Sequence, residues 1–159
     1  MSRRTAGTCE VGSTDSAHYR RWTEERVRFN DVDMQGHVNN AVIQTYFEVG
    51  RIGLGLLGEC PPEPDLGLVL AQILIQYLAP IPWPALVRIG TRVAAVSERS
   101  CTMQQALFLG PRCMAVCGAV VVSIELLSGK AVAHGQRRRT YLESLHRSEA
   151  VISRDAHGR

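Results

Sequence analysis

Helix-period apolar positions mark one segment of the chain, from Val38 to Leu57. Apolar residues recur every three to four positions there, and the opposite side of the same helix is also largely apolar, which is typical of a buried helix. Asn39 is a good N-cap, so Asn40 is expected to be the first helical residue, with an unpaired backbone N–H. Several glycines in the second half predict the close approach of another backbone. Gly58 and the prolines that follow are expected to end the helix.

Alternation with a period of two predicts strands on both sides of this helix. One strand, Arg26–Asn30, precedes it. Four more follow, over residues 68–78, 85–97, 102–109 and 113–127. The order β-α-β-β-β-β predicts an α+β protein, in which a five-stranded antiparallel sheet wraps around one long central helix. The last four strands are expected to form a meander, and the free sheet edge predicts an oligomer.

The chain length of 159 residues fits one folded domain. Residues 1–20 are rich in Gly, Ser and Thr without periodicity and predict a flexible N-terminal tail. Residues 21–136 are expected to form the domain. Residues 137–159 are expected to be a C-terminal tail with a short helix over 139–147. The arginines at 137–139 are interpreted as a solvated run.

Composition argues against several classes of function. The net charge is only +3 and aromatic residues make up 6% of the chain, so binding to nucleic acid is not expected. No apolar run approaches the roughly 20 residues of a membrane span, and the N-terminus lacks the apolar core of a secretory signal, so a cytoplasmic location is expected. The five cysteines form no CxxC pair, which favours reduced, core-forming residues and no metal site.

Chemistry-bearing side chains gather just before the long helix. Asp31, Asp33, Gly36, His37 and Asn39 fall within nine positions of a polar junction between a predicted strand and the buried helix. The start of a helix offers free backbone N–H groups, and a turn can bring side chains to them. This junction is therefore the candidate site.

The run Val27-Arg28-Phe29-Asn30-Asp31-Val32-Asp33-Met34-Gln35-Gly36-His37-Val38-Asn39-Asn40, with Tyr46-Phe47-Glu48 and Arg51 downstream, carries a family resemblance. It resembles the hotdog-fold acyl-CoA thioesterases of the 4-hydroxybenzoyl-CoA thioesterase type, over roughly residues 24–134. The resemblance implies a homodimer in which two sheets join edge to edge, or a homotetramer of such dimers. It places the active sites at the subunit interface and implies no cofactor.

The resemblance also implies roles for residues at the junction. Asp33 would either attack the thioester carbonyl or activate a water, and the backbone N–H of Asn40 would donate to the oxyanion. His37 would either orient water and polarise the carbonyl, or hold the turn through hydrogen bonds. Asp31 is expected to be structural, bonding turn amides or pairing with Arg28 or Arg51. Residues expected to line the substrate site are Gly36, Val38, Asn39 and Ile43.

Two positions depart from the family pattern. Ile43 stands where the family commonly has Tyr, and Gln35 stands where related plant acyl-carrier-protein thioesterases have Asn. Both lie near the expected acyl group, so the acyl preference does not transfer.

Another thioesterase branch takes its carboxylate from the central helix, but with Asp33 present Glu48 is interpreted as an ion-pair partner of Arg51 or a helix-face residue.

The function expected from these residues is hydrolysis of an acyl-CoA, or of an acyl-acyl-carrier-protein, to the free acid and the thiol. One alternative is a non-catalytic hotdog domain that binds an acyl ligand. A less favoured alternative is an enoyl-CoA hydratase, which typically carries Asp-x-Asn-Pro-x-His; this chain lacks the Asn-Pro and spaces Asp33 and His37 differently.

Overall fold

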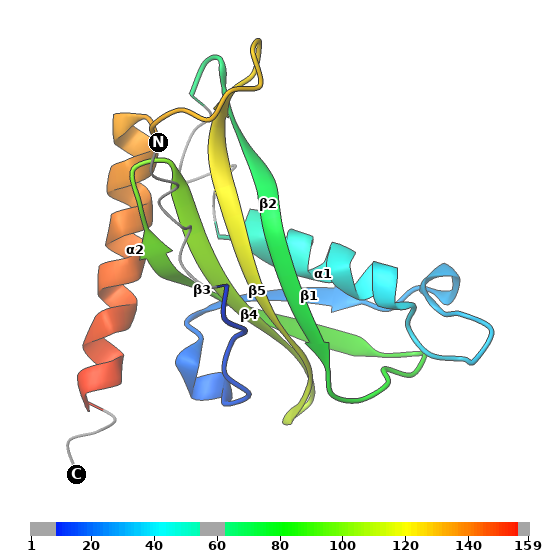
Figure 1. The fold of residues 1–159 in the computed structure, drawn as a ribbon. Coiled ribbons are helices and arrows are strands. Elements are labelled where there is room, and N and C mark those ends of the chain that lie inside the picture. The colour runs from blue at the N-terminus through cyan, green and yellow to red at the C-terminus, as the bar shows by residue number, and fades with distance from the viewer. Residues whose placement is uncertain (1–8, 55–62, 156–159) are drawn as a thin grey trace.

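The computed structural model describes residues 9–54 and 63–155 as one antiparallel sheet with two helices (Figure 1). The strands are β1 (Arg21–Arg26), β2 (Leu66–Tyr77), β3 (Leu86–Val96), β4 (Ser100–Leu109) and β5 (Arg112–Glu125), and the helices are α1 (Asn40–Ile52) and α2 (Gln136–Asp155). Helix α1 follows β1, and α2 follows β5. The predicted α+β class is confirmed.

The five strands lie in the order β1-β3-β4-β5-β2, and every neighbouring pair is antiparallel. The predicted five-stranded antiparallel sheet is therefore confirmed, but the four-strand meander is wrong. Only β3, β4 and β5 follow one another as hairpins. Strand β2 pairs with β5 over its whole length, from Leu66↔Glu125 to Tyr77↔Ala115, and so forms one edge of the sheet. The two longest strands pair, which maximises their shared ladder.

The first strand lies earlier in the chain than predicted. β1 ends at Arg26, and Phe29–Asp31 forms a short 3-10 helix instead of the end of a strand. The Asp31 carboxylate accepts the N–H of Arg28 at 2.7 Å, which bends the backbone out of the extended conformation. Phe29, which the alternation pattern placed in a half-buried strand, is 71% exposed.

Helix α1 begins at Asn40 but is shorter than the sequence predicted. It has 13 residues and ends at Ile52, because Gly53 forms its C-cap; the predicted end at Leu57 lies outside the described residues. A Cβ on Gly50 would meet side-chain atoms of the sheet at 2.6–2.9 Å. The glycines therefore admit sheet side chains, where we expected another backbone.

A second helix shares the covered face of the sheet with α1. The predicted short helix over 139–147 is instead the 20-residue α2, longer than α1, so the protein does not have a single central helix. Its Leu142 and Leu145 pack with Val93 and Met103 of the sheet, and this burial explains why the helix forms. The Tyr141 hydroxyl donates to the carbonyl of Leu54 at the end of α1.

The N-terminal segment crosses the other face of the sheet (Figure 1). Residues 9–20, which we expected in the flexible tail, pack there: Cys9 and Tyr19 are buried, and the Gly12 N–H donates to the carbonyl of Cys117 at 3.2 Å. Tyr19 packs edge-on against Trp22 and Phe108. This aromatic cluster accounts for the order of a segment with no periodic pattern.

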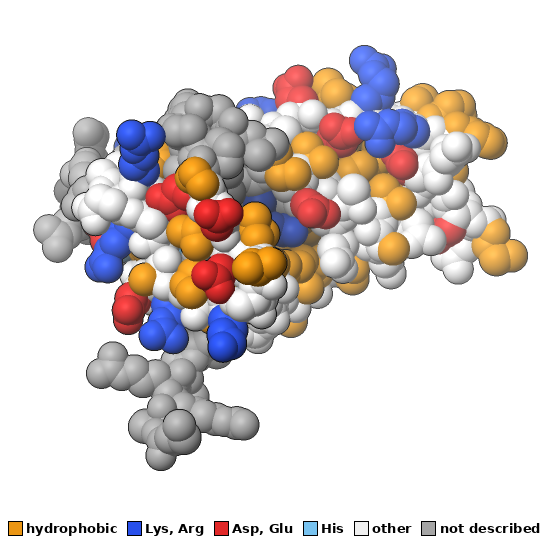
Figure 2. Space-filling model, turned by 90° about the horizontal axis from the view of Figure 1, so that it is seen from above, with side chains coloured by type: hydrophobic (Ala, Val, Ile, Leu, Met, Phe, Trp, Pro, Cys, Tyr) orange, Lys and Arg blue, Asp and Glu red, His pale blue; other side chains and the backbone are white. Residues whose placement is uncertain are grey.

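Charged side chains of both signs are interspersed on the surface in Figure 2, with hydrophobic side chains between them. Within the described ranges 9–54 and 63–155, no helix is long and apolar enough to cross a membrane. The same residues contain no group of three or more His, Cys, Asp or Glu side chains that can hold a metal ion.

The buried His134 makes stability depend on pH. Burial lowers the pKa of its imidazole below the ordinary value near 6.5. Below that value the unfolded chain binds a proton that the folded protein resists, so we expect the free energy of unfolding to fall as the pH drops from 7 towards 5. Urea unfolding at a series of pH values measures this fall. The His134→Gln variant should show a shallower dependence; a slope equal to that of the wild type would contradict the assignment.

Candidate active site

A tight turn at Asp33–Gly36 joins the end of the 3-10 helix to the segment that leads into α1. The Gly36 N–H donates to the carbonyl of Asp33 at 3.0 Å, and the Asp33 N–H donates to the carbonyl of His37 at 2.9 Å. Gly36 has a φ of 78°, a conformation in which an L side chain is strained. The predicted permissive backbone at Gly36 is confirmed.

The Asp33 carboxylate is exposed at this turn. Its Oδ1 accepts the backbone N–H of Gln35 at 2.8 Å, which is an Asx turn. The other carboxylate oxygen forms no hydrogen bond or ion pair with a described residue. One oxygen therefore fixes the side chain while the second is available to a substrate.

The start of α1 leaves a backbone donor unpaired. The Asn39 side chain accepts the N–H of Ala41 at 2.9 Å, and Ile43 begins the ladder by donating to the Asn39 carbonyl at 3.1 Å. The predicted N-cap is therefore confirmed. Within the described part of the chain the Asn40 N–H meets no acceptor, and it carries the partial positive charge of the helix end.

Replacement of the cap tests this local arrangement. We expect Asn39→Ala to lower the free energy of unfolding by about 1 kcal/mol, because Ala41 loses its acceptor. Urea denaturation measures the change. Asn39→Ser supplies a similar oxygen and should retain most of the stability; a loss equal to that of Asn39→Ala would contradict a capping role.

The neighbouring Asp31 has the opposite environment to Asp33. It is 8% exposed, and its Oδ2 accepts both the Arg28 N–H and the Tyr46 hydroxyl, the latter at 2.6 Å. Burial, together with this bond to Asp31, raises the pKa of Tyr46. The expected structural role of Asp31 in holding turn amides is confirmed, whereas its expected pairing with the Arg28 or Arg51 side chain is not found.

The other predicted site residues fall into two groups. Val38 and Ile43 are buried in the main core cluster, beneath the turn. His37 holds the turn through its carbonyl, and its partly exposed imidazole has no hydrogen bond to a described residue. Their roles towards a substrate stay predictions.

The edge strand β2 ends beside the same helix start. The Tyr77 hydroxyl donates to the carbonyl of Asn40 at 3.4 Å. A β-bulge between Leu70 and Gln72 shifts the side-chain alternation of β2, so that even-numbered residues before it and odd-numbered residues after it face α1. Sequence reasoning missed Tyr77, because the contact joins residues far apart in the chain.

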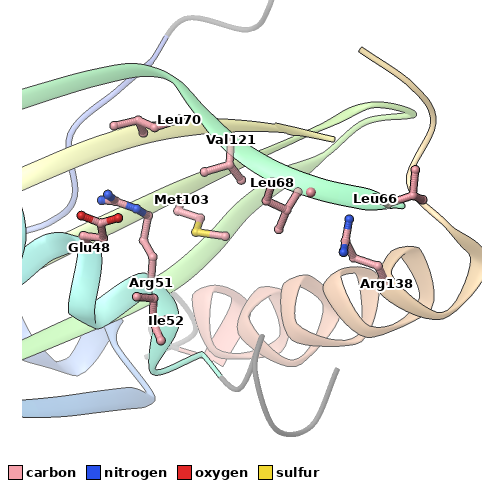
Figure 3. Close-up of a pocket in the computed structure, with 10 residues that line it drawn as sticks. Glu48, Arg51, Ile52, Leu66, Leu68, Leu70, Met103, Val121 and Arg138 are labelled. Atoms are coloured by element: carbon pink, nitrogen blue, oxygen red, sulfur yellow. The ribbon is translucent and has the colours of Figure 1, made fainter. Parts of the chain in front are cut away.

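A cavity lies at the opposite end of α1 (Figure 3). Its volume is about 310 Å³, and it is bounded by the end of α1, the first half of β2 and the start of α2. It is lined by Glu48, Arg51, Ile52, Leu66, Gly67, Leu68, Leu70, Met103, Val121 and Arg138.

At this cavity one alternative for Glu48 is confirmed and one interpretation is wrong. Glu48 was interpreted as an ion-pair partner of Arg51 or a helix-face residue; it lies exposed on α1, and the Arg51 guanidinium instead donates to Gln105 Oε1 at 3.0 Å. Arg138 was expected to be solvated, but it is 6% exposed and faces Glu63. Sequence reasoning missed Gln105, which forms part of an apolar-looking strand; a polar residue at an inward position of that strand was the available signal.

The chain is similar to known proteins over most of its length. Residues 27–134 match the family model described as the thioesterase-like superfamily. No curated protein sequence matches the chain. Among solved structures, the PA5185 protein of Pseudomonas aeruginosa strain PAO1 is similar with a TM-score of 0.74 at 26% identity, covering 81% of this chain and 93% of that one.

Two further structures come from proteins described as thioesterases. One, from Thermus thermophilus, was solved in complex with coenzyme A and zinc; it has a TM-score of 0.71 at 26% identity and covers 81% of this chain and 96% of its own. The other, YbaW of Escherichia coli, a probable thioesterase, has a TM-score of 0.66 at 24% identity and covers 79% of this chain and 98% of its own. The YbaW likeness shows the fold alone.

Proposed function

Since the chain belongs to the thioesterase-like superfamily, we propose that it hydrolyses an acyl-CoA thioester to a free acid and coenzyme A, with Asp33 as the reacting carboxylate. The hotdog fold of the family agrees with the five-stranded antiparallel sheet and α1. An acyl-acyl-carrier-protein presents the same thioester and remains within the proposal. The free cysteines of the described residues fit a reducing cytoplasm.

One observation carries the proposal: a free carboxylate oxygen and an unpaired helix N–H lie at the two ends of one short segment, residues 33–40. Asp33 pairs with His37 across the turn, and His37 is three residues before Asn40. A thioester needs these two groups, one to supply or activate the nucleophile and one to stabilise the negative oxygen. Neither group is occupied by a described residue.

The reaction then follows in one of two ways. In the first, the Asp33 carboxylate attacks the carbonyl carbon, the C–S bond breaks, and water hydrolyses the resulting anhydride. In the second, Asp33 takes a proton from a water as that water attacks, and the C–S bond breaks in the collapse of the tetrahedral intermediate. In both, the Asn40 N–H donates to the carbonyl oxygen as it gains negative charge. The thiolate leaves and is protonated by solvent.

A second copy of the chain would close the site. Asp33 is exposed, and the edge of β2 offers unpaired backbone groups flanked by the exposed apolar residues Val69, Leu74 and Leu78. Antiparallel pairing of β2 with its copy would set the first half of one strand beside the last half of the other. The cavity of one protomer would then approach the α1 start of its partner. This supports the expected homodimer, alone or within a homotetramer, with sites at the interface.

Coenzyme A as the carrier is supported by the Thermus thermophilus thioesterase, which was solved with that molecule. The test is thiol release from a panel of saturated and aromatic acyl-CoAs by the purified full chain. Release from at least one member is the expected result. Saturable binding without any release would favour the acyl-binding module, and hydration of an enoyl-CoA without thiol release would favour the hydratase.

A further inference from the structure

Two buried arginines line the cavity at the C-terminal end of α1 (Figure 3). Arg51 lies on the α1 side and Arg138 on the α2 side, with Leu68 and Met103 between them. The cavity volume of about 310 Å³ is at the lower end of the range of small-molecule sites. A largely apolar cavity with a cation on each of two sides suits a ligand that is both aliphatic and anionic.

Of the two cavity arginines, Arg51 is the one whose buried charge is less compensated by its neighbours. It is 7% exposed, and its one hydrogen bond to a described residue goes to the neutral Oε1 of Gln105. Gln105 is itself fixed, because its Nε2 donates to the Phe47 carbonyl at 2.8 Å and to Thr91 Oγ1 at 2.9 Å. Burial lowers the pKa of Arg51, which records the cost of holding this charge away from water. An anion in the cavity would offset that cost.

The other charged groups of the cavity compensate the charge of Arg51 only in part. Glu48 is exposed at the rim and its charge favours the charged guanidinium, but no carboxylate of the described residues forms an ion pair with Arg51. Arg138 has a counter-ion, since its Nη1 lies 3.8 Å from Glu63 Oε2, although that nitrogen makes no hydrogen bond. Arg51 is therefore the stronger anchor for a carboxylate, and Arg138 adds a second positive charge.

We propose that this cavity binds an aliphatic carboxylate, with the carboxylate on the Arg51 guanidinium and the alkyl chain along the leucines of β2. Leu66, Leu68 and Leu70 present one continuous apolar wall, because they alternate on the helix-facing side of β2 before its bulge. Two sources carry this chemistry: a free fatty acid, and an acyl chain that ends in a second carboxylate. The second source rests on the proposed hydrolysis, whereas the first does not.

Equilibrium binding of octanoate to the full chain tests the site, with octan-1-ol as the uncharged probe. We expect octanoate to bind about 10- to 100-fold more tightly than octan-1-ol, which is the effect of a charge-assisted hydrogen bond. Arg51→Met should remove this preference and leave octan-1-ol binding unchanged. The matched control is Arg137→Met, which removes an exposed arginine near the same cavity and should change neither affinity.

Further variants keep the proposal falsifiable if Arg51→Met does not fold. Leu68→Trp fills the cavity and should weaken both probes, and Arg138→Met should weaken octanoate alone, by less than Arg51→Met. Asp33→Ala should bind octanoate like the wild type, so a failure of the hydrolysis proposal is separable from a failure of this one. Absence of saturable octanoate binding, equal affinity for the two probes, or octanoate binding that Leu68→Trp leaves unchanged would overturn the proposal.

Turnover distinguishes the two sources. If the carboxylate belongs to the substrate, Arg51→Met or Arg138→Met lowers kcat/KM for adipoyl-CoA and leaves that for hexanoyl-CoA unchanged. If the ligand is a free fatty acid, the same variants lose octanoate binding while both thioesters keep the wild-type kcat/KM. Loss of hexanoyl-CoA turnover equal to that of adipoyl-CoA, with octanoate binding retained, would contradict a carboxylate site.

Discussion

Replacement of Asp33 by Ala is expected to lower kcat for thioester hydrolysis by about 10²- to 10⁴-fold, the range that a positioned proton-transfer group contributes. The carboxylate is exposed and one of its oxygens is already fixed by the Gln35 N–H at 2.8 Å. The other oxygen is the group that would attack the carbonyl or take the proton of water. Without it, the Asn40 N–H can still hold the carbonyl oxygen but nothing supplies the nucleophile. Steady-state thiol release measures the loss.

The matched control for this variant is Asp33→Asn. Its side-chain oxygen can accept the same Gln35 N–H, so the turn should keep its conformation and the free energy of unfolding should stay within about 0.5 kcal/mol of the wild type. Its activity should nevertheless fall as far as that of Asp33→Ala, because an amide neither attacks nor accepts a proton at neutral pH. An active Asp33→Asn variant would assign the residue to the turn alone.

Replacement of Asp31 by Ala is expected to have its main effect on stability. This carboxylate is buried, and it accepts the Arg28 N–H at 2.7 Å and the Tyr46 hydroxyl at 2.6 Å. Hydrogen bonds to a charged group contribute about 1.5–3 kcal/mol each, so the loss of both should lower the free energy of unfolding by roughly 3 kcal/mol or more. Urea denaturation with a common m-value measures the difference.

The Tyr46→Phe variant measures the contribution of one of the two hydrogen bonds of Asp31 by itself. It removes the hydroxyl and leaves the Arg28 N–H in place, so it should cost less than Asp31→Ala. Under conditions in which both Asp31→Ala and Tyr46→Phe are folded, activity should remain measurable, since neither substitution removes a reacting group. An Asp31→Ala protein as stable as the wild type would contradict a structural role, and one as inactive as Asp33→Ala while fully folded would assign catalysis to the wrong aspartate.

Local chemistry explains which features could be predicted from the sequence. The N-cap at Asn39, the helix start at Asn40 and the permissive turn at Gly36 depend on residues within a few positions of one another, and all three are confirmed. The sequence also predicted a structural role for Asp31, the first aspartate of the Asp-x-Asp motif. This role is confirmed by the hydrogen bond that its carboxylate accepts from the Arg28 N–H. Hydrogen bonds of short sequence separation leave a readable pattern.

Long-range pairing explains what could not be predicted. The position of β2 beside β5 depends on which edge of the sheet is open after the two hairpins of β3, β4 and β5 close, and hydrophobic alternation does not encode that choice. Arg138 reads as part of a solvated run, but α2 turns it inward onto Glu63, a residue 75 positions away. The cavity residues come from five strands and helices, so no local spacing marks them.

The most direct test of Asp33 as the reacting carboxylate compares thiol release by the wild type and by Asp33→Asn, on the best acyl-CoA of the panel and at equal concentrations of folded protein. We expect rapid release by the wild type and nearly none by the variant, with superimposable unfolding curves. Equal rates for the two proteins would contradict a catalytic role for Asp33.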